Sequence, residues 1–536
     1  MTSPVSSRPS DCAWGAFDDV APWVLDPNNI SWEKQAIELR VSAQREVPVL
    51  TTPTRIPPVA RLVVVVWVLS KALVPWFVKK KLRPFATPED SRAYISLRMR
   101  KAVERLGSTY IKLGQIISSG EGLFPAELVK EFKLCRDQVP AIPFESVKKT
   151  IESELGKPLT EVFSYIDTTA LAAASIAQVH LATLITGEEV VVKVQRPTVS
   201  KMVRKDLRVM AWLAPHLVGR IKVSALANPP ALVELFAETI VEELDFRIEA
   251  SNMLDVAKML CELNQDRYII PRPHPTLATQ RVLVMQRLSG FKFDDVVGMK
   301  NAGIDTHSVI RTGMIAFMEG AMIYGVFHGD LHGGNLFVMP DGRTALLDFG
   351  IVGRLSGARR MAFLRLMLNA TTNNVVGQVE ALRDLGALPM DTDIQAVIKD
   401  LNLGDAAIDP TTLSGEELVK EVQRIVKALL AYGARMPKEL MLYVKNMVFL
   451  DGAIARLAPE LDILAEIASI SMLFAERHGE RLGRELGVDH TAIEINLDSV
   501  KTGVLGVDAS VNSLTYRDLQ ARRELIQKRM RDHVGR

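Results

Sequence analysis

The sequence predicts an α+β protein, because strand patterns and helix patterns occupy separate stretches of the chain. Three β-type stretches (YID, AQVHLATL and EEVVVKVQ) fall within residues 163–194, and Thr186-Gly187 supplies turn residues between the last two. A fourth stretch, RVLVMQRL at residues 281–288, is continuously apolar, as expected for a buried strand. Helical patterns dominate the chain after Gly290, to about residue 485.

Composition excludes several classes of protein. The chain has 536 residues, enough for roughly two to four folding units. Hydrophobic residues make up 48% and charged residues 24%, which excludes wholesale disorder. The formal net charge of +2 argues against a dedicated nucleic-acid-binding protein. Three cysteines that lie far apart exclude a disulfide framework and a cysteine-rich metal site. The amino-terminal region has no secretory pattern, so we expect a cytoplasmic protein.

An apolar stretch with a basic end stands out near the amino terminus. Residues 62–78 (LVVVVWVLSKALVPWFV) lead directly into the basic run KKKLR at residues 79–83. The stretch is shorter than the roughly 20 apolar residues that span a bilayer, and Lys71 and Pro75 interrupt it. Two interpretations stay open: a segment at a membrane interface with its lysines on anionic headgroups, or a buried helix with a solvated basic end. The stretch also helps to explain the mean hydropathy of +0.12.

Residues 1–60 mix Pro, Ser, Thr and Asp without periodicity, so we expect a mobile extension there. Residues 87–90 (TPED) have the pattern of a helix start, with a hydroxyl cap, a proline and then two acids. One helix or a pair of helices should follow, to about Ser119. Residues 144–156 are also expected to be helical.

A single long helical pattern covers residues 231–263, after Pro229-Pro230. On one straight helix Glu243 points away from a stripe of four acidic side chains. The stripe consists of Glu238, Glu242, Asp245 and Glu249. The tail, residues 514–536, is a candidate basic amphipathic helix whose apolar positions are Leu519, Ile526 and Met530.

The strongest chemical signal is a pair of loop motifs, HGDLHGGN at residues 328–335 and DFG at residues 348–350. Asp330 is followed five residues later by Asn335 and eighteen residues later by Asp348. Phosphoryl transfer needs Mg²⁺ held against nucleotide phosphates and a carboxylate at the acceptor hydroxyl. Asn335 and Asp348 offer the oxygen ligands that Mg²⁺ prefers, at the spacing of protein-kinase-like folds. The sequence therefore predicts a site for ATP and Mg²⁺.

Lys193 lies upstream in VVVKV, on a strand that would bury its aliphatic stem and present its ammonium group to phosphate oxygens. The glycine-rich phosphate loop expected before such a strand is missing. The residues in its place are Ala172, Ala173, Ala174 and Ser175. Alanines let a backbone approach phosphates closely but lack the freedom of glycine at positive φ. By composition alone, a packing turn of small residues stays open as the other interpretation.

Together these motifs resemble the UbiB/AarF family of atypical protein-kinase-like ATPases, relatives of the mitochondrial coenzyme Q kinases. The matching elements extend over about 240 residues, in the order of the family. They are Lys112-Leu113-Gly114-Gln115, the AAASIAQVH run (172–180), Lys193, Glu243-x-Asp245, Glu249, HGDLHGGN and DFG. The KxGQ, alanine-loop and ExD elements are particular to this family.

The resemblance implies a bilobal protein-kinase-like fold of the α+β class. It would have a small β-containing N-lobe (144–288), a mostly helical C-lobe (289–485) and a family-specific N-terminal helical extension (87–143) that carries KxGQ. The apolar and basic membrane-contact segment would occupy residues 61–86. Residues 486–536 would form a basic tail.

The resemblance also assigns roles to residues. Asp330 would be the catalytic aspartate, together with Lys193 and its helix partner Glu249, and Asn335 and Asp348 would bind Mg²⁺. ATP would contact Ala172, Ala173, Ala174, Ser175, Lys193, Met285, Gln286 and Leu288. Lys112 and Gln115 would form a regulatory cover over the site, and Glu243 and Asp245 would engage Lys112. Because Glu243 points away on a straight helix, either the helix bends there or this role of Glu243 fails.

The loop motif departs from the family pattern, which usually reads H-A-D-P-H-P-G-N. This chain has Gly329, Leu331 and Gly333 instead of the alanine and the two prolines. That loop is closer to the one found in choline-kinase and aminoglycoside-phosphotransferase relatives. It keeps open the alternative of a phosphotransferase for a soluble small molecule.

The function implied by the resemblance is a Mg²⁺-dependent ATPase or atypical kinase at a membrane surface, in isoprenoid-quinone or lipid metabolism. Protein kinase activity is not expected. Its partners would be ATP, an anionic membrane surface, isoprenoid lipids and proteins of a lipid or quinone pathway, with no nucleic acid. We expect a cytoplasmic, peripherally membrane-associated protein. The KxGQ cover keeps open a second alternative, a nucleotide-gated pseudokinase scaffold.

Overall fold

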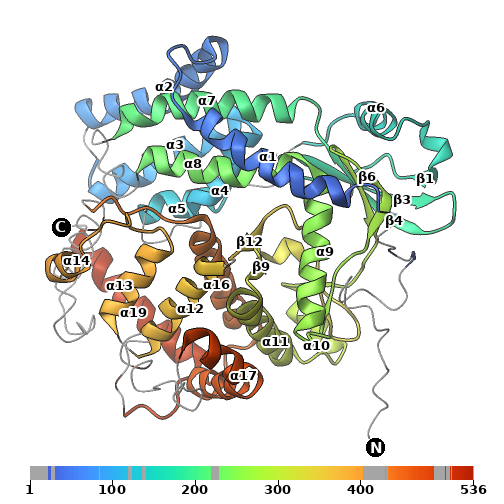
Figure 1. The fold of residues 1–536 in the computed structure, drawn as a ribbon. Coiled ribbons are helices and arrows are strands. Elements are labelled where there is room, and N and C mark those ends of the chain that lie inside the picture. Colours follow the sequence, from blue (N-terminus) through green and yellow to red (C-terminus); the bar gives the residue numbers. More distant parts are fainter. Residues whose placement is uncertain are drawn as a thin grey trace, which may run out of the picture. The chain divides into compact units, whose positions relative to one another are not determined.

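The computed structural model describes residues 30–83, 85–118, 124–135, 140–218, 228–355, 357–372, 374–401, 432–487 and 510–534, together with residues 22, 23, 25, 429, 501 and 508. The chain divides into two compact units. The first contains Met1–Ile304 and His328–Val352, and the second contains Asp305–Phe327 and Gly353–Arg536. The architecture is α+β, with most helices and both larger sheets visible in Figure 1.

A six-stranded sheet forms the β-rich part of the first unit. Its strands follow the order β1-β3-β4-β7-β6, and β2 pairs with β3 beside this path. They are β1 (Phe163–Ile166), β2 (Ala172–Ala173), β3 (Ala177–Leu184), β4 (Glu189–Gln195), β6 (Pro273–Ala278) and β7 (Val282–Gln286). The strands predicted in 163–194 and 281–288 are confirmed. So is the turn at Thr186-Gly187, where Gly187 has a φ of 102°.

Buried and less buried side chains alternate along most of β4, and this alternation determines which face of the sheet Lys193 occupies. Val190, Val192 and Val194 are buried in a core shared with α6 (Phe144–Leu155), the helix predicted at 144–156. Successive side chains of a strand point to opposite faces of the sheet, so Lys193 lies on the other face. Burial of the valines therefore fixes the register that presents the lysine.

A four-stranded sheet in the order β5-β11-β10-β8 carries the two loop motifs. Its strands are β5 (Tyr268–Ile269), β8 (Phe291–Lys292), β10 (Leu336–Val338) and β11 (Thr344–Leu346). The strand β10 begins directly after Asn335, and β11 ends two residues before Asp348. The strand β5 pairs in parallel with β11. Residues 289–304 and 328–352 both belong to the first unit, whereas the resemblance implied a boundary after residue 288.

The amino-terminal region contains a packed helix, α1 (Glu33–Thr51). It buries four side chains that share one side of the helix: Ala36, Ala43, Val47 and Leu50. Trp32, at its start, is buried and donates its indole N–H to the carbonyl of His274 on β6, at 3.1 Å. The prediction of a mobile extension is therefore wrong for residues 33–51. The apolar positions are widely spaced and diluted by polar neighbours, which concealed the helical pattern.

The apolar stretch forms one continuous helix, α2 (Val59–Leu82), of 24 residues. It runs through Pro75, which lacks the N–H that would bond to the carbonyl of Lys71. Arg98 of α3 (Pro88–Leu106) donates instead to that carbonyl and to the carbonyl of Ala72. The helix stays continuous at Pro75 because this tertiary contact replaces the missing hydrogen bond.

The predicted helix pair after residue 87 is confirmed. The Thr87 side chain accepts from the N–H of Asp90 and caps α3. Gly107, with a φ of 97°, turns the chain into α4 (Ser108–Ser118), and α5 (Ala126–Phe132) packs against both helices. Arg61 of α2 pairs with buried Asp206 of α7 (Val199–Leu217), at 2.5 Å, and donates to the carbonyl of Leu106.

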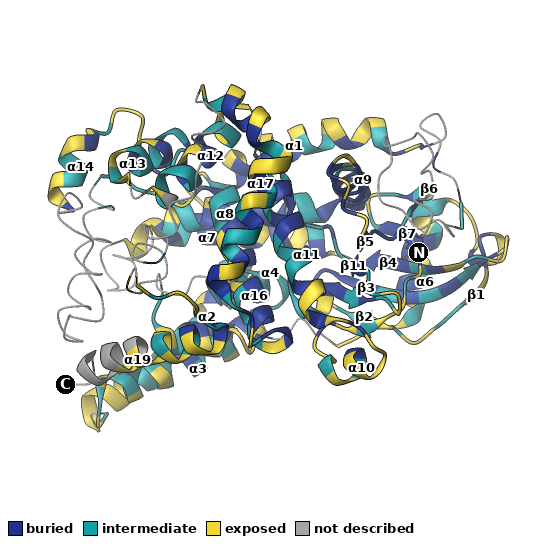
Figure 2. Cartoon of the chain, turned by 90° about the horizontal axis from the view of Figure 1, so that it is seen from below, coloured by how far each residue is buried: buried dark blue, intermediate teal, exposed yellow. Residues whose placement is uncertain are grey.

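The long helical pattern over residues 231–263 is broken in the structure. It forms α8 (Pro229–Ile240), a single 3-10 turn at Glu242–Leu244 and α9 (Phe246–Glu262). Asp245 adopts an extended conformation and its carboxylate accepts from the N–H of Arg247, so it caps α9. The pattern is therefore not one continuous helix: Asp245 starts a new helix, which gives the bend that the sequence had left open. Figure 2 shows that α9 and the strands beside it are largely buried.

The second unit is mostly helical, as predicted for the chain after Gly290. Its helices are α11 (Thr306–Glu319), a π-helical turn (Gly320–Tyr324), α12 (Gly357–Thr371), α13 (Val375–Asp384), α14 (Ile394–Asp400), α16 (Lys438–Leu457), α17 (Ile463–Leu486) and α19 (Tyr516–Val534). The short helix α10 (Val296–Asn301) belongs to the first unit, and β9 (Val326–His328) and β12 (Val352–Arg354) lie where the chain passes between units. The predicted tail helix is present. Tyr516 and Leu519 are buried in it, whereas the side chains of Ile526 and Met530 lie outside the described residues.

His274 gives the first unit a pH-dependent stability. Its Nδ1 accepts from the backbone N–H groups of Thr276 and Leu277, both at 3.2 Å, and burial lowers its pKa to about 4. The unfolded chain, with an ordinary histidine pKa near 6.5, binds the proton first. Stability should therefore be lost as the pH falls from about 6.5 toward 4. Thermal unfolding of the wild type and of His274→Gln should diverge over this range. His216→Gln, at an exposed position of α7, is the matched control, and equal pH slopes for all three proteins would contradict the prediction.

Candidate functional site

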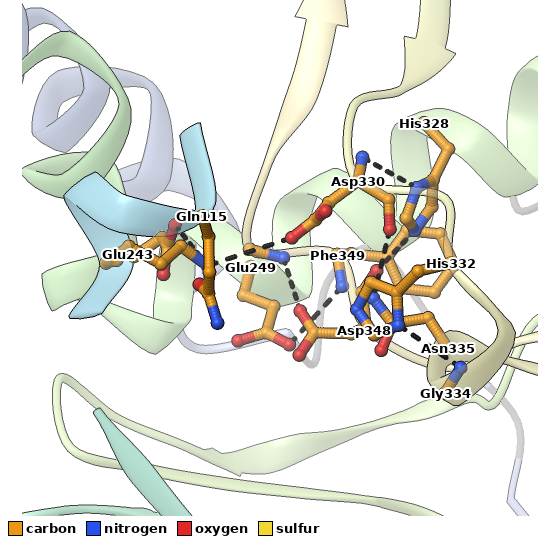
Figure 3. A network of polar contacts seen from close by, with 12 residues as sticks. Gln115, Glu243, Glu249, His328, Asp330, His332, Gly334, Asn335, Asp348 and Phe349 are labelled. Carbon is orange, nitrogen blue, oxygen red and sulfur yellow. Dashed lines mark hydrogen bonds and ion pairs between the residues drawn. The ribbon is translucent and has the colours of Figure 1, made fainter. Parts of the chain in front are cut away.

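A network of charged side chains gathers within the first unit, where α4, β4, α9 and the two loop motifs meet (Figure 3). Lys193 lies at its centre. Its ammonium group is 2.6 Å from Glu249 Oε1 and 3.1 Å from Asp348 Oδ2. One cation from β4 thus joins α9 to the loop that follows β11.

The two carboxylates beside Lys193 respond in opposite ways. Burial raises the pKa of Glu249 to about 7, although the ammonium group of Lys193 opposes the shift. Burial would also raise the pKa of Asp348, but Lys193 and the N–H of Gly350 outweigh it and hold that pKa at about 2. The Asp348 side chain keeps 44% of its surface exposed. Asp348 is therefore the ionised, accessible carboxylate of the pair.

The backbone of Phe349 is held by α9 from two sides. Its N–H donates to Glu249 Oε1 at 3.4 Å, and its carbonyl accepts from the amide group of Asn252 at 2.8 Å. The Phe349 ring is fully buried. Asn252 was not among the residues predicted for the site, although it stands three residues after Glu249 and hence on the same side of the helix.

His328 links the two loop motifs to each other. Its Nδ1 accepts from the N–H of Asp330 at 3.1 Å, which leaves the proton on Nε2, and Nε2 donates to the carbonyl of Asp348. Burial lowers the pKa of His328 and favours this neutral form. Asn335 holds the same loop, because its side-chain amide donates to the carbonyl of Asp330 at 3.1 Å.

Lys112 enters the site from α4. Its ammonium group is 3.1 Å from Glu243 Oε1 and 3.7 Å from Asp330 Oδ2. Burial raises the pKa of Glu243, and Lys112 opposes the shift. Gln115 extends from the same helix into the network (Figure 3). The break between α8 and α9 allows Glu243 to reach the site, which one straight helix would not have done.

The resemblance assigned Asp245 to Lys112 as well, and here the structure differs. The carboxylate of Asp245 pairs with the guanidinium group of Arg247, at 2.7 Å, and caps α9. A Cβ atom at Gly114 would lie 3.4 Å from Sγ of Cys135, an ordinary contact, so this position of α4 is not limited to glycine.

The alanine loop forms a narrow turn between β2 and β3. Ala173 pairs with Gln178, and the N–H of Ala174 donates to the carbonyl of Ala177 at 2.9 Å. Arg196, three residues after Lys193, donates to the carbonyl of Ala174. None of the four loop residues 172–175 has a positive φ, which explains how alanine can stand where glycine was expected. Ser175 is buried, whereas Ala172 and Ala174 are exposed.

Met285 and Gln286, two of the residues predicted to contact ATP, end β7, and Leu288 follows two residues later. Met285 and Gln286 are buried, and Leu288 is partly exposed. The side-chain oxygen of Gln286 accepts from the N–H of Arg272 at 3.2 Å. This side chain therefore ties β7 to β6, and its contact with a nucleotide stays a prediction.

The donor set suits Mg²⁺. Because the amide nitrogen of Asn335 bonds to Asp330, its amide oxygen is the group left to serve as a ligand, next to the ionised carboxylate of Asp348. No group of three or more His, Cys, Asp or Glu side chains that could hold a metal ion occurs among the described residues. A kinase-type Mg²⁺ site does not need one, since the ion takes one or two protein ligands together with substrate phosphates and water.

Comparison with known proteins gives a consistent result. Residues 134–382 match the model of the ABC1 atypical kinase-like domain. A chloroplast protein of Arabidopsis thaliana, described as an uncharacterized aarF domain-containing protein kinase, is 32% identical over 402 residues, which cover 69% of this chain and 73% of the relative. An uncharacterized protein of Mycobacterium tuberculosis is 35% identical over 367 residues, covering 67% and 74%. The probable protein kinase UbiB of Marinobacter nauticus is 30% identical over 396 residues, covering 73% and 70%.

Gly329 stands where the family pattern usually has alanine, and in this chain Ile351 leaves no room for a side chain there. Its N–H donates to the carbonyl of Ile351 at 2.9 Å, and a Cβ atom would come within 2.7 Å of Cγ2 of Ile351 and 3.0 Å of its carbonyl oxygen. Gly329→Ala should destabilise the protein by about 1–3 kcal/mol, as overpacking does. Gly333→Ala, in the same loop, meets nothing within 4 Å and should change stability by less than about 0.5 kcal/mol. Denaturant unfolding measures both, and equal stabilities would contradict the steric argument.

Proposed function

This chain belongs to the ABC1/AarF family of atypical kinase-like proteins, which includes the UbiB proteins, and from that premise we propose that it binds ATP with Mg²⁺ as an ATPase or atypical kinase. We place its action at a membrane surface, in isoprenoid-quinone or lipid metabolism. The observation that carries the enzymatic part is the assembled contact of Lys193 with both Glu249 and Asp348. In kinase-like folds this lysine–glutamate pair and the aspartate of the metal loop must both be in place for phosphoryl transfer.

Each site residue has a defined task in this proposal. Lys193 binds phosphate oxygens of ATP, and Glu249 holds the ammonium group in position. Asn335 and Asp348 would hold Mg²⁺, which neutralises charge on the phosphates when bound. Asp330 orients the hydroxyl of the acceptor or a water molecule and accepts its proton. His328 keeps Asp330 and Asp348 at a fixed separation through its two ring nitrogens.

The position of Lys112 supports a small acceptor or water over a protein substrate. Its ammonium group lies 3.7 Å from Asp330, where the acceptor hydroxyl of a protein substrate would have to approach. A helix that brings a side chain to the catalytic aspartate leaves little room for a polypeptide. This arrangement favours ATPase activity or a small-molecule acceptor.

The membrane part of the proposal rests on α2. Within the described part of the chain, α2 alone is long and apolar enough to cross a membrane, which by itself is weak evidence. One side of α2 is held to the first unit by Arg61 with Asp206, by Arg98 and by a hydrogen bond from Trp76 to Ser91. The other side exposes a set of large apolar residues. They are Val59, Val63, Val64, Val66, Trp67, Val74, Phe77, Val78 and Leu82.

Contact along a membrane surface suits α2 better than crossing the membrane. A helix fastened to its own unit near both ends cannot enter a bilayer lengthwise without losing those contacts. Its exposed apolar side, continued by three lysines in the last turn, fits the acyl boundary and the anionic headgroups of a membrane. Isoprenoid lipids and enzymes of lipid or quinone pathways would be encountered there by a peripheral cytoplasmic protein.

ATP hydrolysis should depend on Mg²⁺ and on Asp348. Asp348→Asn removes a charged metal ligand and should lower hydrolysis at least about 100-fold, since charge stabilisation by the metal supplies several kcal/mol. Asp341→Asn, at an exposed turn of the same unit, is the matched control and should retain activity. Phosphate release with and without Mg²⁺ measures the effect.

A wild type that binds nucleotide but shows no hydrolysis, with or without lipid, would favour the pseudokinase scaffold. Lipid-independent phosphorylation of one soluble metabolite would favour the small-molecule phosphotransferase.

Binding to anionic vesicles should depend on the exposed side of α2. Trp67 and Phe77 are 57% and 58% exposed, so Trp67→Glu with Phe77→Glu should leave folding intact. Burial of two aromatic side chains is worth several kcal/mol, so the double variant should weaken binding to phosphatidylglycerol vesicles at least about tenfold. Ile37→Glu with Met202→Glu, exposed positions on α1 and α7, provides the control. Undiminished sedimentation of the Trp67/Phe77 variant with vesicles would refute the membrane contact.

A further inference from the structure

A single arginine of the amino-terminal helix reaches α9 behind the site. The guanidinium Nη2 of Arg40 lies 2.8 Å from Ser251 Oγ, 2.9 Å from Asn252 Oδ1 and 3.0 Å from Asp255 Oδ2. Ser251 and Asn252 are buried, and the Arg40 side chain is 18% exposed. Three side chains of one helix face are thus held by one group from α1.

Asn252 carries this contact through to the metal loop. Its amide oxygen accepts from Arg40, and its amide nitrogen donates to the carbonyl of Phe349 at 2.8 Å. The oxygen of the Asn252 amide therefore points to Arg40 and its nitrogen points to Phe349. The cation of Arg40 fixes which end is the oxygen, and so directs the N–H donor toward Phe349.

The same helix holds the other side of Phe349. Glu249, three residues earlier, accepts from the N–H of Phe349 at 3.4 Å and from Lys193 at 2.6 Å. The N–H and the carbonyl of Phe349 are therefore both hydrogen-bonded to side chains of α9. A small rotation or shift of α9 would displace Asp348, which directly precedes Phe349.

The helix α1 is anchored on both sides of Arg40. Before it, Trp32 donates to the carbonyl of His274 on β6, and after it, Glu46 pairs with Arg204 of α7. Within the first unit α1 also packs against α8 and α9, beside which it runs in Figure 1. Arg40 therefore sits in the middle of a helix whose ends are fixed to other elements.

We propose that Arg40 is a positioning residue for the metal loop: acting through Asn252, it orients the backbone of Phe349 and thereby the carboxylate of Asp348. The role of Asp348 in catalysis rests on the proposed function, whereas the positioning itself does not. In kinase-like folds the placement of the corresponding helix controls whether the lysine–glutamate pair and the metal loop are assembled. Here the chain supplies that placement from its own amino-terminal helix.

Hydrogen exchange of the unliganded full-length protein tests the positioning directly. Arg40→Ala should speed amide exchange in peptides covering residues 344–351 at least about fivefold, because the contact that orients Asn252 is lost. Arg40 meets α9 at Ser251, Asn252 and Asp255, so faster exchange at residues 344–351 would report on the link that Asn252 makes to Phe349. Asn252→Ala should give the same change, and the double variant should add nothing further.

Two controls separate positioning from general stability. Arg45→Ala removes an exposed arginine of the same helix and should leave exchange at 344–351 as in the wild type. Asp255→Asn weakens the ion pair of Arg40 but keeps Asn252, so it should lower the unfolding temperature while sparing those residues. Wild-type exchange at 344–351 in Arg40→Ala, or equal acceleration in Asp255→Asn, would overturn the inference.

Steady-state kinetics adds a second readout. Arg40→Ala should lower kcat about tenfold and raise the Mg²⁺ concentration for half-maximal rate, with the KM for ATP changed less than about twofold, because Lys193 and the alanine loop are untouched. A KM that rises as much as kcat falls would contradict the assignment. If the wild type hydrolyses no ATP, the proposed function fails, yet the exchange experiment still decides whether Arg40 positions Phe349.

Discussion

The site depends on one buried contact, in which the ammonium group of Lys193 is shared by Glu249 and Asp348. These residues are separated from Lys193 by 56 and 155 positions in the sequence, so the contact joins a strand, a helix and a loop that no local preference would bring together. Burying the carboxylate of Glu249 without a cation would be strongly unfavourable, and Lys193 supplies that cation while also pairing with the more exposed Asp348. The pKa values of Glu249 and Asp348 shift in opposite directions, although Lys193 contacts both carboxylates. Asp348 keeps its charge with help from Gly350, and the fully enclosed Glu249 titrates near pH 7.

The sequence was informative where spacing alone determines the chemistry. The intervals between Asp330, Asn335 and Asp348 predicted a common site, and the structure brings these loops together through His328. The apolar run VVVKV predicted a strand that presents Lys193, and in β4 the buried valines fix the face that the lysine occupies. Both predictions concern residues whose positions follow from a loop length or from the two-residue period of a strand. They needed no knowledge of distant partners.

The sequence was less informative where a tertiary contact overrides the local pattern. A straight helix over residues 231–263 would have turned Glu243 away from the site, and the break at Asp245 reverses this result. Aspartate is a favoured residue at the start of a helix, so the break carried a signal that periodicity concealed. No comparable signal in the sequence indicated that Arg98 would donate a hydrogen bond to the carbonyl of Lys71, which Pro75 leaves without its usual donor. Nor did the sequence indicate that Arg40 would contact α9. In both cases the two partners lie far apart in the chain.

The balance of charge in the site argues for what it binds. Two ammonium groups, of Lys112 and Lys193, contact four carboxylates, of Glu243, Glu249, Asp330 and Asp348. With all of them ionised, the cluster would hold two negative charges in excess, and the raised pKa values of Glu243 and Glu249 are the expected response to such an excess under burial. A solvated acidic face would show no such shift. On the proposed function, a divalent cation held by the oxygen donors of Asn335 and Asp348 would offset part of this negative charge. Under the same proposal Lys193 and Asp348 would act together, because the lysine would bind the phosphates whose metal ion the neighbouring carboxylate would hold.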